Sequence, residues 1–337
     1  MGLNLRPRRW FGNKKKVALI SNKNSGLGTP RAGLGKVIGS ILTTPYWHYD
    51  TATLSELDES VKRIASEQPD IFAFTGGDGS VHQIISRILR EYSERGIPLP
   101  KFLYIGTGTM MVIARSLKLD KMSAVDFTKK ITAKIEAQQK GLIAPFDTTH
   151  VNPLMINGEG GFLYGAGLPV NLLHEYYKGG DKLGPSRAMR VGLATFWDEL
   201  KALLTFRKSK KMLTKPVHAR VILPGLDPPV APYMTHTVLL VSSVDQLGMG
   251  CRGMPLAMSK PNHFMLRSSR LEFWGLAANL PAIWAGWSPL PSTFDVVLSE
   301  LVIEYESPTE TMVDGEMKPP TFRDVIISGP PLEFITG

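Results

Sequence analysis

Short apolar runs alternate with segments of helical spacing through the first part of the chain. The apolar runs lead into glycine-containing loops and are predicted strands: Lys16–Ser21, Asp70–Gly77 and Lys101–Thr109. The other segments carry apolar residues on one face and are predicted helices: Ser55–Gln68, Ser80–Glu94 and Met122–Gly141. Strands that alternate with helices predict a doubly wound α/β domain, with a parallel sheet covered by helices on both faces.

The pattern changes near Ala144–Asp147. From there on the chain carries β-type runs separated by Pro and Gly, together with a helix-like basic insert at about Ser186–Met212. This pattern predicts an antiparallel sandwich-like second domain. We therefore expect domains at 1–145 and 146–337, and the extreme C-terminus could pack back on the first domain. A chain of 337 residues is also longer than one core usually supports.

Charge and cysteine content narrow the classes of protein. The 39 Lys and Arg against 30 Asp and Glu leave a formal charge of +9, which favours anionic partners such as nucleotides, nucleic acid or anionic lipid surfaces. The single cysteine, Cys251, excludes an internal disulfide framework and a cysteine-based zinc site, as is typical of a reducing compartment.

The chain shows no hydrophobic stretch suited to a secretory signal or a membrane span. The longest apolar segment, "WGLAANLPAIWAGW", is shorter than the roughly 18 to 20 residues that a bilayer requires and is interrupted by Pro281. We therefore expect a cytoplasmic protein that is soluble or lies peripherally on the inner face of the membrane.

Three loops that follow predicted strands contain glycine: Ser21–Gly26, Thr75–Ser80 and Gly106–Thr109. Because the carboxyl ends of parallel strands share one edge of a sheet, these loops should converge there. Their backbone N–H groups and the helix that begins near Ser80 could then bind phosphate. For each loop alone, the alternative is a turn in which glycine permits a positive φ angle.

Asp78 lies inside the second of these loops, where a carboxylate would repel phosphate. The side chain is compatible with a phosphate site if it binds Mg²⁺ or accepts a proton from an attacking hydroxyl. We therefore treat Asp78 as a candidate functional residue.

These motifs, taken in order, resemble the diacylglycerol kinase catalytic domain superfamily, which includes sphingosine and ceramide kinases and soluble bacterial lipid kinases. "TGGDGSVHQIISRIL" resembles its GGDGT-x-x-E signature, and "SNKNSG" resembles its N-P-x-S-G loop with Lys23 in place of proline. "YIGTGTMMVIARSLKL" is similar to the third block of the family. "FDTTHVN" with "GFLYGAG" resembles the entry into the second domain, and "MVDGEM" resembles the C-terminal D-G-E motif.

The resemblance implies a lipid kinase with ATP and Mg²⁺ in a cleft between the two domains. It implies that the following residues bind the nucleotide: Asn22, Ser25, Gly26, Thr75, Gly76, Gly77, Gly79, Ser80, Thr107, Gly108 and Thr109. Asp78 and Glu316 are the candidate catalytic residues, and either could be the base. Asp78 and Asp314 are the candidate metal ligands. For the segment that contains Asp314, the alternative is a hairpin turn, since Asp-Gly is a standard two-residue connection.

The chain departs from the family pattern beside these motifs. Gln83 stands where the family has glutamate, and Met111 stands where the third block has asparagine. His82, in the first turn of a predicted helix, is expected to be partly exposed. Asn171 lies near an acidic position of sphingosine kinases, which argues against a sphingoid base as the substrate.

Two basic segments, Arg6–Lys16 and Phe206–Lys215, contain aromatic and apolar residues. They could dock on an anionic membrane surface, where each nearby cation adds about 1 kcal/mol, and the alternative is a solvated basic face. Nucleic acid is disfavoured as a partner because no recognised binding motif accompanies the charge.

The sequence therefore predicts transfer of the γ-phosphoryl group of ATP to a hydroxyl of a diacylglycerol-like lipid. Two alternatives stay open: a catalytically impaired relative that binds nucleotide or lipid, and an enzyme of the NAD kinase type. The particular lipid and the oligomeric state do not follow from the sequence.

Overall fold

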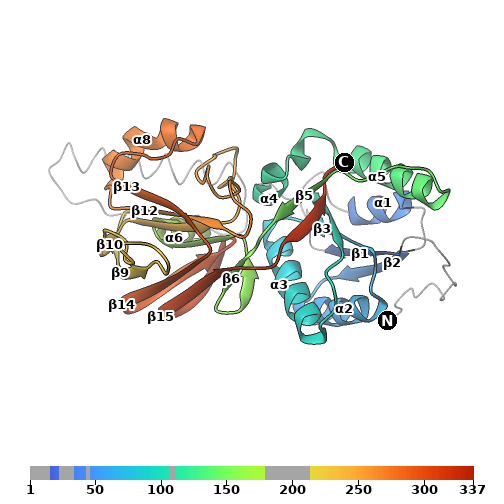
Figure 1. Ribbon diagram of the computed structural model, residues 1–337, viewed down its shortest axis with the longest axis horizontal. Helices are drawn as coiled ribbons and strands as arrows, with labels where there is room; N and C mark the ends of the chain where they lie inside the picture. The colour runs from blue at the N-terminus through green and yellow to red at the C-terminus, as the bar shows by residue number, and fades with distance from the viewer. Residues whose placement is uncertain (1–15, 23–33, 43–45, 107–110, 179–212) are drawn as a thin grey trace. The chain divides into compact units, whose positions relative to one another are not determined.

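The protein is described by a computed structural model over residues 16–22, 34–42, 46–106, 111–178 and 213–337. It forms two compact units, of which the first comprises residues 1–151 and 331–337 and the second comprises residues 152–330. Figure 1 shows the elements of each unit. The basic insert predicted at 186–212 lies outside the described residues.

The first unit contains a six-stranded sheet in the order β2-β1-β3-β4-β16-β5. Its strands are β1 (Val17–Asn22), β2 (Tyr46–Thr51), β3 (Ile71–Gly76), β4 (Lys101–Gly106), β5 (Thr148–Val151) and β16 (Leu332–Ile335). The strands from β2 to β4 run parallel, as the alternation of strands and helices predicted. β16 is parallel to β4 and antiparallel to β5, so the sheet as a whole is mixed.

Helices pack around this sheet. They are α1 (Leu34–Ile41), α2 (Leu54–Glu67), α3 (Asp78–Arg95), α4 (Val112–Ser116) and α5 (Ala124–Gln139), with a 3₁₀ turn, η1, at Leu119–Lys121. α2 begins earlier than predicted because Thr53 caps it: the Thr53 hydroxyl accepts from Glu56 N at 3.2 Å. The Glu56 carboxylate in turn accepts from Ala52 N at 2.7 Å, which completes a reciprocal cap.

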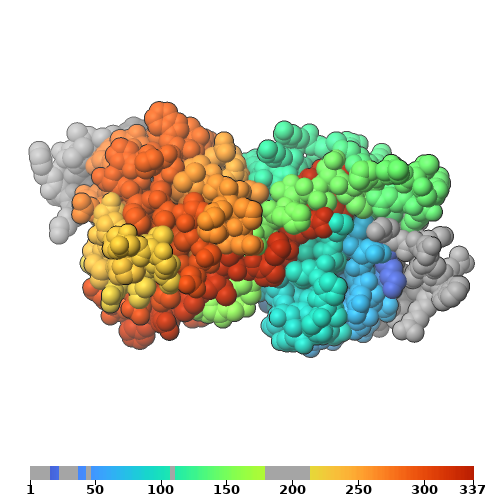
Figure 2. Space-filling model, viewed as in Figure 1, coloured from blue at the N-terminus to red at the C-terminus, as the bar shows by residue number. Residues whose placement is uncertain are grey.

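Aromatic side chains form much of the core of the first unit. Phe74 and Tyr104 stack with their ring centroids 5.2 Å apart, and Phe102 and Phe334 lie 5.6 Å apart. All four are fully buried. Phe334 comes from the C-terminal strand β16, and Figure 2 shows the red C-terminal atoms among the green and cyan atoms of the first unit. The last residues of the chain therefore complete the core of the N-terminal unit.

The second unit is built on a ten-stranded sheet whose paired strands are antiparallel. Its main path runs β13-β12-β11-β8-β14-β15-β6-β7, and β9 joins β10 to β14. The strands are β6 (Leu154–Ile156), β7 (Glu159–Gly161), β8 (Leu163–Gly167), β9 (Val217–Ile222), β10 (Thr235–His236), β11 (Val238–Ser242), β12 (Phe264–Ser269), β13 (Thr293–Leu298), β14 (Glu300–Val313) and β15 (Glu316–Ser328). Two helices, α6 (Leu168–Tyr177) and α8 (Phe273–Ala285), accompany them. The predicted fold class, an α/β domain followed by an antiparallel β domain, is confirmed.

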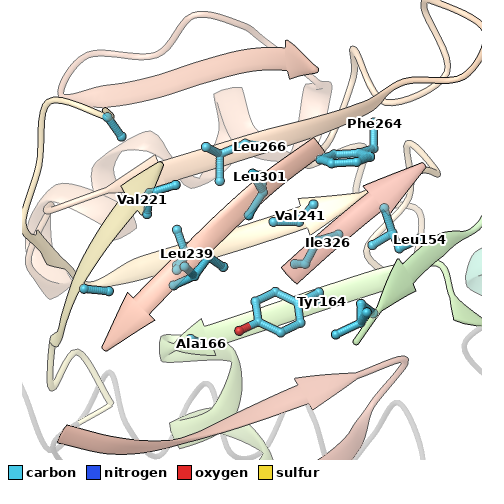
Figure 3. Close-up of a cluster of buried hydrophobic side chains, with 14 of the residues drawn as sticks. Leu154, Tyr164, Ala166, Val221, Leu239, Val241, Phe264, Leu266, Leu301 and Ile326 are labelled. Atoms are coloured by element: carbon cyan, nitrogen blue, oxygen red, sulfur yellow. The ribbon is translucent and has the colours of Figure 1, made fainter. Parts of the chain in front are cut away.

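Alternate residues of these strands meet in a buried cluster that includes Leu239, Phe264 and Leu301 (Figure 3). Three buried polar groups meet at this cluster: the Tyr164 hydroxyl lies 2.6 Å from both the Tyr305 hydroxyl and Asp324 Oδ2. Burial raises the pKa of both tyrosines, so their hydroxyls stay protonated at neutral pH.

Among the described residues, no helix combines the length and apolar character that a bilayer span needs.

Candidate functional site

The carboxyl ends of β1, β3 and β4 lie side by side at one edge of the first sheet. Ser21 pairs with Thr75, and Gly76 pairs with Gly106, so the three strands end level with one another. The loops that follow them begin at the same edge, as predicted for parallel strands. Thr75 itself is buried in β3, with 2% of its surface exposed.

A hydrogen bond joins the end of β1 to the start of α3, the helix that follows β3. Asn22 Nδ2 donates to Ser80 Oγ at 3.0 Å, which links the last residue of β1 to the first turn of α3. Two residues assigned to the nucleotide site from separate motifs are thereby in direct contact. Ser25 and Gly26 of the first loop lie outside the described residues.

Glycine at position 76 allows the backbone of β3 to lie close to Ser80, and it is not needed for an unusual backbone angle. A Cβ atom at this position would lie 2.4 Å from Ser80 Cβ and 2.8 Å from Ser80 Oγ. None of Gly76, Gly77 and Gly79 has a positive φ angle, so the turn alternative based on positive φ does not apply to this loop. Glycine at position 76 instead lets the first turn of α3 pack directly against the end of β3.

α3 begins within the Thr75–Ser80 loop. Gly77 is its N-cap with φ −87°, and Asp78, Gly79 and Ser80 form its first turn, all half-buried. The first N–H groups of a helix have no partner within the helix, and the helix dipole adds positive potential there. The N-terminus of this 18-residue helix is therefore suited to a phosphate group.

Asp78 connects the start of α3 with the segment that follows β4. Asp78 Oδ1 accepts a hydrogen bond from Ile113 N, in the first turn of α4, at 3.3 Å. This hydrogen bond links the first turns of α3 and α4 through the Asp78 carboxylate. Thr107, Gly108 and Thr109 of the third loop lie outside the described residues.

The D-G-E motif forms the hairpin between β14 and β15 in the second unit. Asp314 and Gly315 occupy the two turn positions with φ angles of 50° and 86°, and the strands resume at Glu316. Asp314 Oδ1 accepts from Leu163 N at 2.8 Å and from Phe162 N at 3.1 Å. The Asp314 carboxylate therefore fixes the hairpin against the strand β8, which is a structural role.

Glu316 is the first residue of β15 and is half-buried. Burial raises the pKa of the Tyr177 hydroxyl in α6, and the charges of Tyr176 and Glu316 raise it further. The Tyr177 hydroxyl also donates to Gly315 O at 3.3 Å. The hairpin and the end of α6 thus hold Glu316 in a defined environment.

No metal cluster is found in the part of the chain that the structure describes: His, Cys, Asp and Glu nowhere gather in a group of three or more there. Asp78 belongs to the first unit, and Asp314 and Glu316 belong to the second. Mg²⁺ commonly binds through one or two carboxylates together with phosphate oxygens and water.

The positions that depart from the family pattern have defined structural roles. His82 is completely buried in α3, so the expectation of partial exposure is wrong: the helix turns this position toward the core. Gln83 accepts a hydrogen bond from Arg87, whose Nε donates to Asp58 Oδ1 at 2.7 Å. Met111 is the N-cap of α4 with φ 51°, and it lies against the end of β4 at Gly106.

A polar cluster at the end of β1 was not predicted from the sequence. Ser21 Oγ lies 2.6 Å from His48 Nε2 and donates to Asp50, and His48 Nε2 lies 3.2 Å from Asp50 Oδ1. Burial lowers the pKa of His48, and the Asp50 carboxylate partly opposes this shift. The polar residues His48 and Asp50 are visible in the segment "YWHYDT". Their contact with Ser21 could not be predicted, because it depends on the register of β1 with β2, which pairs Ser21 with Asp50.

A comparison with protein families finds a match within the first unit. Residues 16–143 match the family described as the diacylglycerol kinase catalytic domain. The resemblance found in the sequence is confirmed for this part of the chain. A comparison with curated proteins finds no match.

Solved structures share the fold of nearly the whole chain. A diacylglycerol kinase from Bacillus anthracis str. Sterne is 14% identical, with a TM-score of 0.61 over 96% of this chain and 98% of that chain. Two structures described as proposed diacylglycerol kinases of the same organism are each 17% identical, with TM-scores of 0.64 and 0.65 and the same coverage. At this identity the match establishes the common fold.

Proposed function

We propose that this protein is an ATP-dependent lipid kinase, which transfers the γ-phosphoryl group of ATP to a free hydroxyl of a diacylglycerol-like lipid. The observation that carries the proposal is the Asn22–Ser80 contact at the N-terminus of α3, with the Asp78 carboxylate in the same turn. The match of residues 16–143 to the diacylglycerol kinase catalytic domain family supports the same reaction.

In this proposal the ends of β1 and β3 bind the phosphates of ATP. The N–H groups of Gly79 and Ser80 and the Asn22 side chain would donate to phosphate oxygens. The contact of Asn22 with Ser80, and the close approach of Gly76 to Ser80, support this proposal. Ser25, Gly26, Thr107, Gly108 and Thr109 extend the proposed nucleotide site on the basis of their motifs. Lysine and arginine residues elsewhere on the basic chain would favour the approach of the anionic nucleotide.

The reaction requires one base and one charge-neutralising group. A carboxylate takes the proton from the lipid hydroxyl, the hydroxyl oxygen bonds to the γ-phosphorus, and the bond to the bridging oxygen breaks to release ADP. Asp78 and Glu316 are the two candidates for the base. If Mg²⁺ binds with ATP, Asp78 would be its protein ligand, and the ion would neutralise phosphate charge.

The test is incubation of the protein with labelled ATP and a total lipid extract, followed by identification of the labelled product. Asp78→Asn and Glu316→Gln should each abolish transfer. Asn retains an oxygen that can accept from Ile113 N, so Asp78→Asn removes the charge and preserves the hydrogen bond. Asp126→Asn and Glu300→Gln, at exposed positions, are matched controls. Full activity in both site variants would contradict the assignment.

A second candidate function is nucleotide or lipid binding without turnover. Two positions favour it: Met111 cannot coordinate a metal usefully, and Gln83 holds no charge and bonds to Arg87. Calorimetry that detects tight binding of Mg·ATP, together with no transfer to any lipid, would support this function over the first. Phosphorylation of a soluble dinucleotide in place of lipid would instead indicate the NAD kinase type.

A further inference from the structure

The helix α8 of the second unit lacks the polar outer face of an ordinary surface helix. None of its residues is buried, and the segment from Phe273 to Trp287 contains no Asp, Glu, Lys or Arg. Its one strongly polar side chain, Asn279, donates to Gly275 O of the same helix at 2.8 Å. A helix on a protein surface normally presents charged residues to water, so an uncharged outer face indicates a different environment.

Large apolar side chains of this helix and of the residues just after it are exposed. Leu276 packs against a cluster of buried side chains. Further along the chain, Leu280, Trp284 and Trp287 are 50%, 42% and 65% exposed, so apolar area is exposed at the C-terminal end of α8. We refer to Leu280, Trp284 and Trp287 as the α8 patch (Figure 1 shows α8 beside β13).

The fold holds the C-terminal end of this patch in place. Arg267 and Asp295 form a buried ion pair at 2.7 Å, with side chains 5% and 2% exposed. Arg267 also donates to Trp287 O at 2.9 Å and to Gly253 O at 2.6 Å, while Ser288 Oγ donates to Asp295 at 2.7 Å. Hydrogen bonds with the buried Arg267–Asp295 pair therefore fix the chain just after α8, at Trp287 and Ser288.

The helix end itself is also fixed. Gly286 adopts φ 81°, Gly286 N donates to Ile283 O at 3.1 Å, and Trp287 N donates to Ala282 O at 2.9 Å. Because the backbone of Trp287 is ordered in advance, binding through its ring loses less conformational entropy.

The charges around the patch suit an anionic surface. Arg252 N donates to Trp284 O at 3.1 Å, and the Arg252 side chain is 55% exposed whereas its partner Asp245 is 18% exposed. The outward charge at this end is therefore positive. At the other end Arg270 is exposed, and the acid Glu272 is the N-cap of α8, where the helix dipole partly offsets its charge.

We propose that the α8 patch docks the protein on the interface of an anionic lipid bilayer. Tryptophan places an apolar ring among acyl chains and leaves its N–H near the headgroups, and Leu280 adds apolar area that a bilayer can accept without hydrogen bonds. A protein partner would require polar groups around an apolar centre, whereas the outer face of α8 offers almost none. This surface is distinct from the predicted basic segments and does not depend on phosphoryl transfer.

The test uses the full chain and sedimentation with vesicles in the absence of ATP. Vesicles of phosphatidylcholine are compared with vesicles that also contain phosphatidylglycerol. The chain should sediment with the anionic vesicles, and the double variant Trp284→Ser/Trp287→Ser should bind at least about 10-fold more weakly. Phe322→Ser is the matched control, because Phe322 is 60% exposed on β15, outside the patch. Thermal unfolding confirms that each variant is folded.

Three results would overturn the inference. The first is no binding of the full chain to either kind of vesicle. The second is equal binding of the double variant and the unchanged chain. The third is self-association that the double variant abolishes while neither protein binds vesicles, which would assign the patch to a second copy. A chain that binds vesicles through the patch but transfers no phosphate supports the docking surface and contradicts the proposed kinase function, so the two failures are distinguishable.

Discussion

Asn22 Nδ2 donates a hydrogen bond to Ser80 Oγ at 3.0 Å and so joins the end of β1 to the first turn of α3. In the proposed function, this contact would hold Asn22 and Ser80 beside the phosphate groups of ATP. We expect Asn22→Ala to weaken ATP binding by roughly 3- to 10-fold, since one hydrogen bond is typically worth about 0.5–1.5 kcal/mol. Calorimetry with Mg·ATP measures this change.

Asn279→Ala is the control for this variant, because it also removes an amide side chain but lies on α8 in the second unit. Its ATP affinity should equal that of the unchanged protein. Equal affinity in Asn22→Ala would contradict the placement of the nucleotide at this edge of the sheet.

Gly76→Ala should destabilise the first unit and reduce nucleotide binding. The added Cβ would lie 2.4 Å from Ser80 Cβ, so the start of α3 must move away from β3. Overpacking of this kind typically costs about 1–3 kcal/mol, which chemical denaturation can measure. The second substitution Ser80→Gly removes the atoms with which the new methyl group collides. Gly76→Ala/Ser80→Gly should therefore recover stability, and failure to recover it would show that the close approach is not the cause.

The buried pair Arg267–Asp295 should contribute far more to stability than an exposed pair. Arg267→Met leaves the Asp295 carboxylate buried without its cation, and such a loss typically costs about 3–5 kcal/mol. The exposed pair Arg323–Glu304, at 4.0 Å, provides the control, and Arg323→Met should change the free energy of unfolding by less than about 1 kcal/mol. Similar losses in the two variants would contradict the burial of Arg267.

Stability should fall in acid because of buried histidine. His236 is fully buried between Ser268 Oγ, 2.7 Å from Nδ1, and Ala219 O, 3.0 Å from Nε2. Burial lowers its pKa from the ordinary value of 6.5, so the unfolded chain binds a proton more readily than the folded chain. The stabilising contribution of neutral His236 is therefore fully present above about pH 6.5, and the free energy of unfolding decreases as the pH falls below this value. The pKa of His48 is shifted in the same direction.

Urea denaturation at a series of pH values from 8 to about 5 tests this dependence. His236→Gln should be less stable at neutral pH but should lose less stability on acidification than the unchanged protein. An identical pH dependence in the two proteins would exclude His236 as a source of the acid sensitivity.

The architecture followed from local patterns where those patterns are strong. Short apolar runs predicted β1, β3 and β4, and period-3.6 spacing predicted α2, α3 and α5, whereas β2, α1 and α4 were not predicted. Parallel strands require their carboxyl ends to share an edge. The bond between Asn22 and Ser80 agrees with that geometric rule. The start of α2 was misplaced because Ser55 and Thr53 can both cap a helix, and only the structure shows which hydroxyl accepts from Glu56 N.

Other features depend on contacts between residues far apart in sequence. β16 has four residues, and its pairing with β4 and β5 cannot be inferred from so short an apolar run. The Ser21, His48 and Asp50 cluster requires the register of β1 with β2. The sequence marked the segment from Trp274 to Trp287 as apolar, but an apolar run is equally typical of a buried helix. Its exposure follows from the position of α8 on the surface of its unit.

The proposed activity is phosphoryl transfer to lipid through a site that contains Asp78. The most direct measurement is transfer of label from γ-labelled ATP to a total lipid extract, with the unchanged protein, Asp78→Asn and the control Asp126→Asn assayed in parallel. We predict a labelled lipid with the unchanged protein and with Asp126→Asn, and none with Asp78→Asn. A labelled lipid formed at full rate by Asp78→Asn, or no labelled lipid from the unchanged protein, would contradict the account.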